Sequence, residues 1–133
     1  VKMVHNGIEY GMMQAIAEGF TLMHDSPFGL DLAAVADVYQ HASVIESRLV
    51  GWLGSAYERF GRDLDPVSGA PGHTGEGAWT VDAAREAGIP APVIEAALQF
   101  RIDSADAPSY TGRVVQALRN EFGGHGLAPE PPK

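Results

Sequence analysis

Residues 2–23 read KMVHNGIEYGMMQAIAEGFTLM, and this stretch decides the fold. Its apolar side chains recur every three or four positions, the period of a helix that buries one face. The positions that carry this period are Met3, Val4, Ile8, Met12, Ile16, Phe20 and Met23. The spacing predicts one long helix of about six turns. The chain starts at Val1 with no capping side chain before this pattern, so we expect the C-terminal part of a longer protein.

The remaining sequence predicts an all-α domain, because no segment alternates apolar and polar residues as a strand does. Further helices are expected over residues 31–39, 44–61, 81–87, 90–103 and 110–122. Ser43 and Thr80 are the expected caps of the second and third of these. Residues 63–78 are rich in glycine and proline, which predicts a long loop, and the Gly- and Pro-rich residues 123–133 predict an extended C-terminal tail.

Composition and charge exclude several classes of protein. The 133 residues are at most one ordinary domain, and 17 acidic against 9 basic side chains leave a net charge of -8. That balance lacks the basic footprint of nucleic-acid binding. The absence of cysteine excludes disulfides, thiolate metal sites and a cysteine nucleophile. No apolar run is long enough to span a membrane, so we expect a cytoplasmic protein that binds neither nucleic acid nor membrane.

Four polar residues gather on one side of the first helix. At about 100° per residue, their side chains fall within roughly a third of the helix circumference. They are Lys2, His5, Asn6 and Glu9, called the polar stripe below. The other side carries Val4, Ile8 and Gly11, which are able to pack inward or against a neighbouring helix. The polar stripe therefore faces either bulk water or a cleft.

The composition of the polar stripe favours a cleft. Asn6 and Gly7 are poor helix formers, each costing roughly 0.5 to 1 kcal/mol relative to Ala, so something other than helix stability selected them. A desolvated lysine loses its proton near neutral pH and acts as a general base, whereas a glutamate in the same cleft keeps its proton and acts as an acid. Lys2 and Glu9 could therefore run opposite proton transfers on one substrate.

At this point the residues resemble a known family. The sequence KMVHNGIEYG at 2–11 is similar to the signature of the decarboxylating 6-phosphogluconate dehydrogenases, where it opens the long first helix of an all-helical domain. Met12, Met13 and Gln14 resemble the short-chain branch of that family. The similarity continues in the same order along the chain, at residues 43–47, 74–80, 88–90 and 119–125. The resemblance implies that residues 1–133 are the C-terminal, substrate-binding and dimerisation domain.

The resemblance also implies roles for individual residues. Lys2 matches the general base that takes the proton from the hydroxyl at carbon 3 of the substrate, and Glu9 matches the acid that protonates carbon 1 of the enediol left after carbon dioxide departs. His5 and Asn6 match contacts to substrate hydroxyl and carboxylate groups. Tyr10 matches a phosphate contact.

Three residues further along the chain complete the implied site. Arg101 falls where the family has a phosphate-binding arginine. Arg119 and His125 match a pair that reaches from the tail of one subunit into the active site of its partner. The resemblance thus implies a homo-oligomer, at least a dimer with tail exchange.

The implied reaction is the oxidation and decarboxylation of a phosphorylated sugar acid, 6-phosphogluconate, to ribulose 5-phosphate. Its cofactor would be NADP or NAD, bound by an N-terminal nucleotide-binding domain that is not in this chain, so the isolated domain should not transfer hydride. The short stretch Gly75-Glu76-Gly77 does not follow a strand and predicts no dinucleotide site, so no cofactor-binding residue is assigned here.

Two other functions stay open. One is a non-catalytic helical oligomerisation module in which the polar stripe is merely solvated. The other is a related sugar-acid or hydroxyacid dehydrogenase with altered phosphate recognition, because Ala78 and Ala105 stand where the family carries basic residues. We expect no metal site: the candidate ligands His24, Asp25, His41 and His73 lack an HExxH arrangement.

Overall fold

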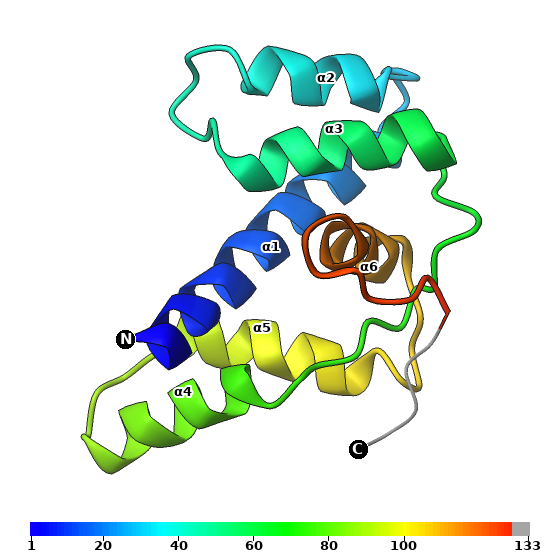
Figure 1. Ribbon diagram of the computed structural model, residues 1–133. Coiled ribbons are helices and arrows are strands. Elements are labelled where there is room, and N and C mark those ends of the chain that lie inside the picture. Colours follow the sequence, from blue (N-terminus) through cyan, green and yellow to red (C-terminus); the bar gives the residue numbers. More distant parts are fainter. Residues whose placement is uncertain (129–133) are drawn as a thin grey trace.

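The computed structural model describes residues 1–128, and every regular element in that range is a helix (Figure 1). The helices are α1 (Lys2–His24), α2 (Leu32–Tyr39), α3 (Arg48–Phe60), α4 (Glu76–Glu86), α5 (Pro92–Asp103) and α6 (Tyr110–Gly123). The predicted all-α class and the long first helix are therefore confirmed. Helix α1 begins at Lys2 after Val1, which provides no side-chain cap.

Helix α1 joins the two ends of the molecule (Figure 1). Its C-terminal part contacts α2, its N-terminal part contacts the pair α4 and α5, and α6 packs against both α1 and α3. A large core surrounds Met13, Phe20, Leu53 and Leu118, and a smaller core beneath α4 and α5 is centred on Tyr10. The second core places α1, α4 and α5 in fixed positions around the polar stripe.

Ser43 was predicted to cap the third helix, and this is wrong. The helix begins at Arg48, and its cap is Ser47, whose hydroxyl accepts a hydrogen bond from the Val50 amide at 3.3 Å. The hydroxyl of Ser43 instead donates to the carbonyl of Tyr39 and so closes the end of α2. Two serines four residues apart both satisfy the capping pattern, and only the path of the connecting turn selects between them.

Thr80 was predicted to cap the fourth helix, and this is also wrong. Helix α4 begins at Glu76, five residues before the predicted start, after Gly75, which adopts a left-handed φ of 97°. Thr80 lies inside α4, where its hydroxyl donates to the Glu76 carbonyl at 3.0 Å and to the Met3 carbonyl of α1 at 2.8 Å. The hydroxyl thus joins two helices instead of starting one.

The other predicted helix boundaries agree with the structure to within about two residues. Asp31 caps α2 by accepting from the Ala34 amide, and Ser109 caps α6 by accepting from the Gly112 amide. The loop predicted over residues 63–78 lies at 61–75, and its end is three residues earlier than expected because α4 begins at Glu76. Residues 124–128 are non-helical, as expected for the tail, and the remainder of that prediction lies outside the described residues.

The two sides of α1 differ in a way that the sequence pattern did not predict. Gly11 is buried, as expected for a residue that faces a neighbouring helix. Val4 and Ile8, however, are 47% and 53% exposed in this chain. The buried face of α1 is therefore centred on Gly7, Tyr10 and Met13, not on Val4 and Ile8 as the pattern predicted. With this orientation of the helix, part of the polar stripe faces α4 and α6.

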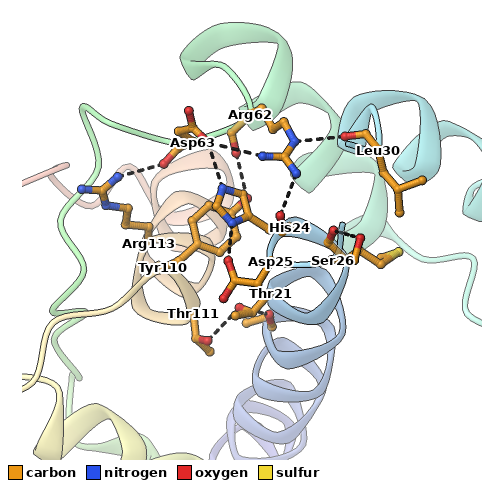
Figure 2. Close-up of polar contacts among 12 residues, drawn as sticks. Thr21, His24, Asp25, Ser26, Leu30, Arg62, Asp63, Tyr110, Thr111 and Arg113 are labelled. Atoms are coloured by element: carbon orange, nitrogen blue, oxygen red, sulfur yellow. Dashed lines mark hydrogen bonds and ion pairs between the residues drawn. The ribbon is translucent and has the colours of Figure 1, made fainter. Parts of the chain in front are cut away.

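A polar cluster fixes the far end of α1 to the start of α6 (Figure 2). The two ring nitrogens of His24 lie 2.7 Å from Asp25 Oδ1 and 2.8 Å from Asp63 Oδ1. The ring stacks on Tyr110 at a centroid distance of 3.7 Å, and Arg62 donates to the His24 carbonyl at 2.7 Å. His24 and Asp25 thus have a structural role, and within residues 1–128 no three acidic or histidine side chains converge as a metal site.

None of the helices in the described range combines the length and the apolar character needed to cross a bilayer.

Candidate functional site

A pocket of about 220 Å³ opens where α1, α4, α5 and α6 meet. Its lining comprises Asn6, Glu9, Tyr10, Met13, Thr74, Glu76, Arg101, Arg119, Phe122 and His125. Six of the eight residues predicted for the site are among them, although they come from segments up to 119 positions apart. The two that do not line the pocket are Lys2 and His5.

Arg101 contributes a buried guanidinium to the lining of the pocket. It is only 4% exposed, and its guanidinium carbon lies 3.5 Å from the centroid of the Tyr10 ring. No carboxylate of the described residues lies within ion-pair distance of it. Burial lowers the pKa of Arg101 to about 10, the nearby charge of Arg119 adds to that lowering, and Tyr10 and Glu9 oppose it. A buried guanidinium without a carboxylate partner is costly, which favours an anionic ligand.

Arg119 supplies a second guanidinium to the same pocket. Its side chain is 2% exposed, and its Nη1 donates to Gln116 Oε1 at 2.9 Å. Gln116 in turn donates through its amide nitrogen to the carbonyl of Gly126. Arg119 and Arg101 are close enough for each charge to disfavour the other, so an anion between them would relieve that repulsion.

The segment after α6 brings His125 to the pocket. The Asn120 side-chain amide donates to the His125 carbonyl at 2.7 Å, and the backbone amide of Ser68 donates to the Leu127 carbonyl at 2.7 Å. Gly123 allows this path, because a Cβ there would lie 2.7 Å from the His125 ring. His125 therefore lines the pocket of its own chain, and the tail exchange implied by the resemblance stays a prediction.

Glu9 carries the partly buried carboxyl group of the polar stripe. Its side chain is 23% exposed, and burial is the main reason that its pKa is raised. His5 and Arg101 oppose this effect, and the carboxylate of Glu76 adds to it. The result is a carboxyl group that holds its proton more firmly than a solvated one, as a general acid needs.

Lys2 and His5 lie outside the pocket lining. The side chain of His5 is 74% exposed, but its Nδ1 lies 3.1 Å from Asn6 Oδ1, so it contacts a residue of the pocket. Lys2 is exposed at the first position of α1, on the same helix face as Glu9 and about 10 Å from it along the axis. Its role as a base stays a prediction.

Two glycines allow α1 and α4 to come close enough to form the pocket. A Cβ at Gly7 would lie 2.5 Å from the Thr80 side chain, and a Cβ at Gly77 would lie 2.4 Å from the Tyr10 ring. These contacts are far shorter than van der Waals distances, so neither position admits a larger residue without movement. The close approach explains the helix-breaking Gly7 in the polar segment of α1.

Four residues of the pocket were not among the predicted site residues: Met13, Thr74, Glu76 and Phe122. Thr74 and Glu76 lie in the 74–80 segment on which the resemblance rested, so that segment carried a signal for them. Met13 and Phe122 have helical spacing typical of core residues, and nothing in the sequence separates their pocket-facing position from an interior one.

The family profile described as "6-phosphogluconate dehydrogenase, C-terminal domain" matches residues 1–110. The Bacillus subtilis protein YqeC is 47% identical over 125 residues, which cover 94% of this chain and 42% of that protein. The NAD(+)-dependent, decarboxylating 6-phosphogluconate dehydrogenase of Haloferax volcanii is 38% identical over 128 residues, 96% of this chain and 43% of that enzyme.

A third relative matches a smaller part of this chain, and its name specifies no cofactor. The decarboxylating 6-phosphogluconate dehydrogenase of Synechococcus elongatus is 38% identical over 114 residues, 79% of this chain and 24% of the enzyme. The chain thus spans less than half the length of each of these three relatives. The profile match over residues 1–110 and the relative that is 47% identical show that the chain belongs to the family of 6-phosphogluconate dehydrogenase C-terminal domains.

Proposed function

We propose that this chain is the substrate-binding part of an enzyme that oxidatively decarboxylates 6-phosphogluconate. One observation carries the proposal: Arg101 and Arg119, both almost fully buried, line one small pocket together with the raised-pKa carboxyl group of Glu9. Paired guanidiniums bind phosphate and carboxylate groups in a planar, bidentate manner. The names of the relatives from Haloferax volcanii and Synechococcus elongatus support this substrate.

Tyr10 supports an anion at the same place. Its hydroxyl is buried beside the Arg101 guanidinium, which can only donate, and it donates to no acceptor in the described range. A buried hydroxyl hydrogen without an acceptor costs on the order of 1 to 3 kcal/mol. A phosphate oxygen beside Arg101 would accept that hydrogen bond and remove the cost.

In the proposed reaction, Lys2 removes the proton from the hydroxyl on carbon 3 while that carbon is oxidised. After carbon dioxide leaves, Glu9 gives its proton to carbon 1 of the enediol. Asn6, His5 and His125 orient the hydroxyl groups between the two ends of the substrate.

These steps describe what the residues of this chain do. The hydride acceptor, NAD or NADP, is bound elsewhere. The segment Gly75-Glu76-Gly77 opens a helix without a preceding strand, so it does not have the form of a dinucleotide-binding turn. We assign the cofactor to a separate nucleotide-binding domain, in agreement with the greater length of the relatives.

Binding to the chain tests the substrate. Calorimetric titration should show 6-phosphogluconate binding at least tenfold more tightly than gluconate, since a phosphate held by charged hydrogen bonds contributes more than about 1.4 kcal/mol. Arg101→Ala should abolish that preference, whereas Arg85→Ala, an exposed arginine on α4, should preserve it. Equal affinities for the two ligands would instead favour a sugar-acid dehydrogenase with altered phosphate recognition.

Turnover tests the chemistry. With the chain joined to a nucleotide-binding domain of a relative, carbon dioxide release should fall by at least a hundredfold in Lys2→Ala and in Glu9→Gln. The control is Glu18→Gln, on the same helix but exposed and bonded to Gln14. Unchanged release in both active-site variants would favour a non-catalytic oligomerisation module.

A further inference from the structure

The pocket contains a carboxylate that the proposed reaction does not use. Glu76, at the first position of α4, lines the pocket together with Glu9. A glutamate in the first turn of a helix interacts favourably with the helix dipole, and that alone would leave its side chain in solvent. Glu76 is instead partly buried, and the hydroxyl of Thr74, which also lines the pocket, donates to its Oε2. The side chain is thus held at the pocket wall.

The polar groups of the pocket are unevenly divided between donors and acceptors. Arg101 and Arg119 are donors only, and they suit the anionic groups of a ligand. In the proposed reaction Glu9 donates its proton, so in that role it presents a donor. Glu76 is the other carboxyl group among the described lining residues, and a carboxylate only accepts hydrogen bonds.

A phosphorylated sugar acid requires such an acceptor. Between its phosphate and its carboxylate lies a chain of carbons that each carry a hydroxyl group. Each hydroxyl hydrogen that enters the pocket loses its hydrogen bond to water and needs an acceptor in the protein to offset that loss. Hydrogen bonds to charged groups are roughly twice as strong as neutral ones. A carboxylate is therefore the most effective group for holding the hydroxylated part of the substrate.

We propose that Glu76 is a specificity-determining residue that accepts hydrogen bonds from the substrate's hydroxyl groups and selects a polyhydroxylated phosphate over other phosphate anions. This inference rests on the proposed function and adds to it the residue that contacts the hydroxyl groups in the middle of the substrate. Thr74 is the positioning residue, because its hydroxyl holds the carboxylate at the wall.

The same carboxylate has the opposite effect on an anion that carries no hydroxyl chain. Its negative charge lies in the same small pocket as Arg101 and Arg119, so it weakens their attraction for phosphate. Replacing Glu76 with Gln removes this repulsion together with the charged acceptor. The substitution should therefore change the affinities for the two classes of ligand in opposite directions.

The experiment is a calorimetric titration of the 133-residue chain with 6-phosphogluconate and, separately, with inorganic phosphate. For Glu76→Gln we expect Kd for 6-phosphogluconate to rise about tenfold and Kd for inorganic phosphate to fall about twofold to threefold. The matched control is Glu86→Gln, which removes the same charge from the exposed last turn of α4 and should change neither value.

A second variant separates the acceptor from the charge. Thr74→Val keeps the carboxylate of Glu76 but removes the hydroxyl that holds it, so Kd for 6-phosphogluconate should rise about threefold while Kd for phosphate stays constant. Circular dichroism of each variant should match that of the unaltered chain, and if Glu76→Gln fails to fold, the Thr74→Val result decides.

Several results would overturn the proposal. If both ligands bind Glu76→Gln more tightly, Glu76 only repels anions. If Glu76→Gln behaves like Glu86→Gln, Glu76 does not contact the ligand. Either result would leave the proposed function intact, provided that the unaltered chain binds 6-phosphogluconate, whereas failure of the unaltered chain to bind it would overturn both proposals.

Discussion

The tightest contact between α1 and α4 can be tested with one methyl group. In Gly7→Ala, the added Cβ would lie 2.5 Å from Thr80 Cγ2 and 2.8 Å from Thr80 Oγ1. Thr80 has little freedom to move, because it is 6% exposed and its hydroxyl donates to the Met3 carbonyl. Either the threonine rotates and gives up that hydrogen bond, or the two helices separate.

The expected magnitude follows from three contributions. Overpacking a fixed contact costs about 1 to 3 kcal/mol, and loss of the Thr80 hydrogen bond costs about 0.5 to 1.5 kcal/mol. Replacing glycine by alanine inside a helix returns about 1 kcal/mol. The free energy of unfolding should therefore fall by about 2 kcal/mol in Gly7→Ala.

Gly19→Ala provides the matched control. It makes the same chemical change in the same helix, but a Cβ at Gly19 meets no atom within 4 Å. Only the helix propensity then acts, and the free energy of unfolding should rise by about 0.5 to 1 kcal/mol. The two variants should therefore move in opposite directions.

Urea unfolding of the chain, followed by circular dichroism, measures both variants at constant slope m. The reasoning is refuted if Gly7→Ala is at least as stable as the unaltered chain, or if both substitutions shift the midpoint the same way. Gly7→Ala should also weaken 6-phosphogluconate binding, because separation of α1 from α4 moves one wall of the pocket.

Three further predictions concern the pocket and the polar cluster at His24. Gly77→Ala should displace the Tyr10 ring, since the new Cβ would lie 2.4 Å from it, and should weaken 6-phosphogluconate binding roughly tenfold in a calorimetric titration. Glu9→Gln should stabilise the chain at pH 7 but not at pH 3.5, as urea midpoints at both pH values would measure. The reason is that burial raises the pKa of Glu9 above 4.5, so ionisation of this carboxyl group reduces the stability of the fold as the pH rises. Asp63→Asn should destabilise the chain at pH 7, because the hydrogen bond with His24 lowers the pKa of Asp63 below 3.8. The stability that this carboxylate contributes is present above that pH and lost below it, so the urea midpoint of the variant should fall less on acidification than that of the unaltered chain.

Much of the helical framework could be predicted because its signals are local. The three-to-four spacing of apolar residues in 2–23 acts over a few residues of chain, and so do the caps observed at Asp31 and Ser109. The errors at Ser43 and Thr80 have the opposite origin. Both hydroxyls suit a cap locally, but each bonds elsewhere: Ser43 to the end of α2, and Thr80 to α1.

For the site, the sequence suggested candidate residues but did not predict how they come together. The stripe on α1 follows from helix geometry, and it correctly placed Asn6 and Glu9 on one face. The two ends of the polar stripe differ, since Glu9 lines the pocket whereas Lys2 is exposed. That closure depends on α4, whose position no local pattern in α1 determines.

By itself, the sequence determined an all-helical chain, the shared face of α1 on which Asn6 and Glu9 lie, and through its motifs the family to which the chain belongs. Only the tertiary structure decided that Arg101 and Arg119 are buried in one pocket, that Glu76 joins them, and that His125 reaches the pocket of its own chain. The physical reason is that helix formation depends on neighbours a few residues apart, whereas burial and electrostatic coupling depend on which helices pack together. Here that packing depends on glycines at which a single methyl group would not fit.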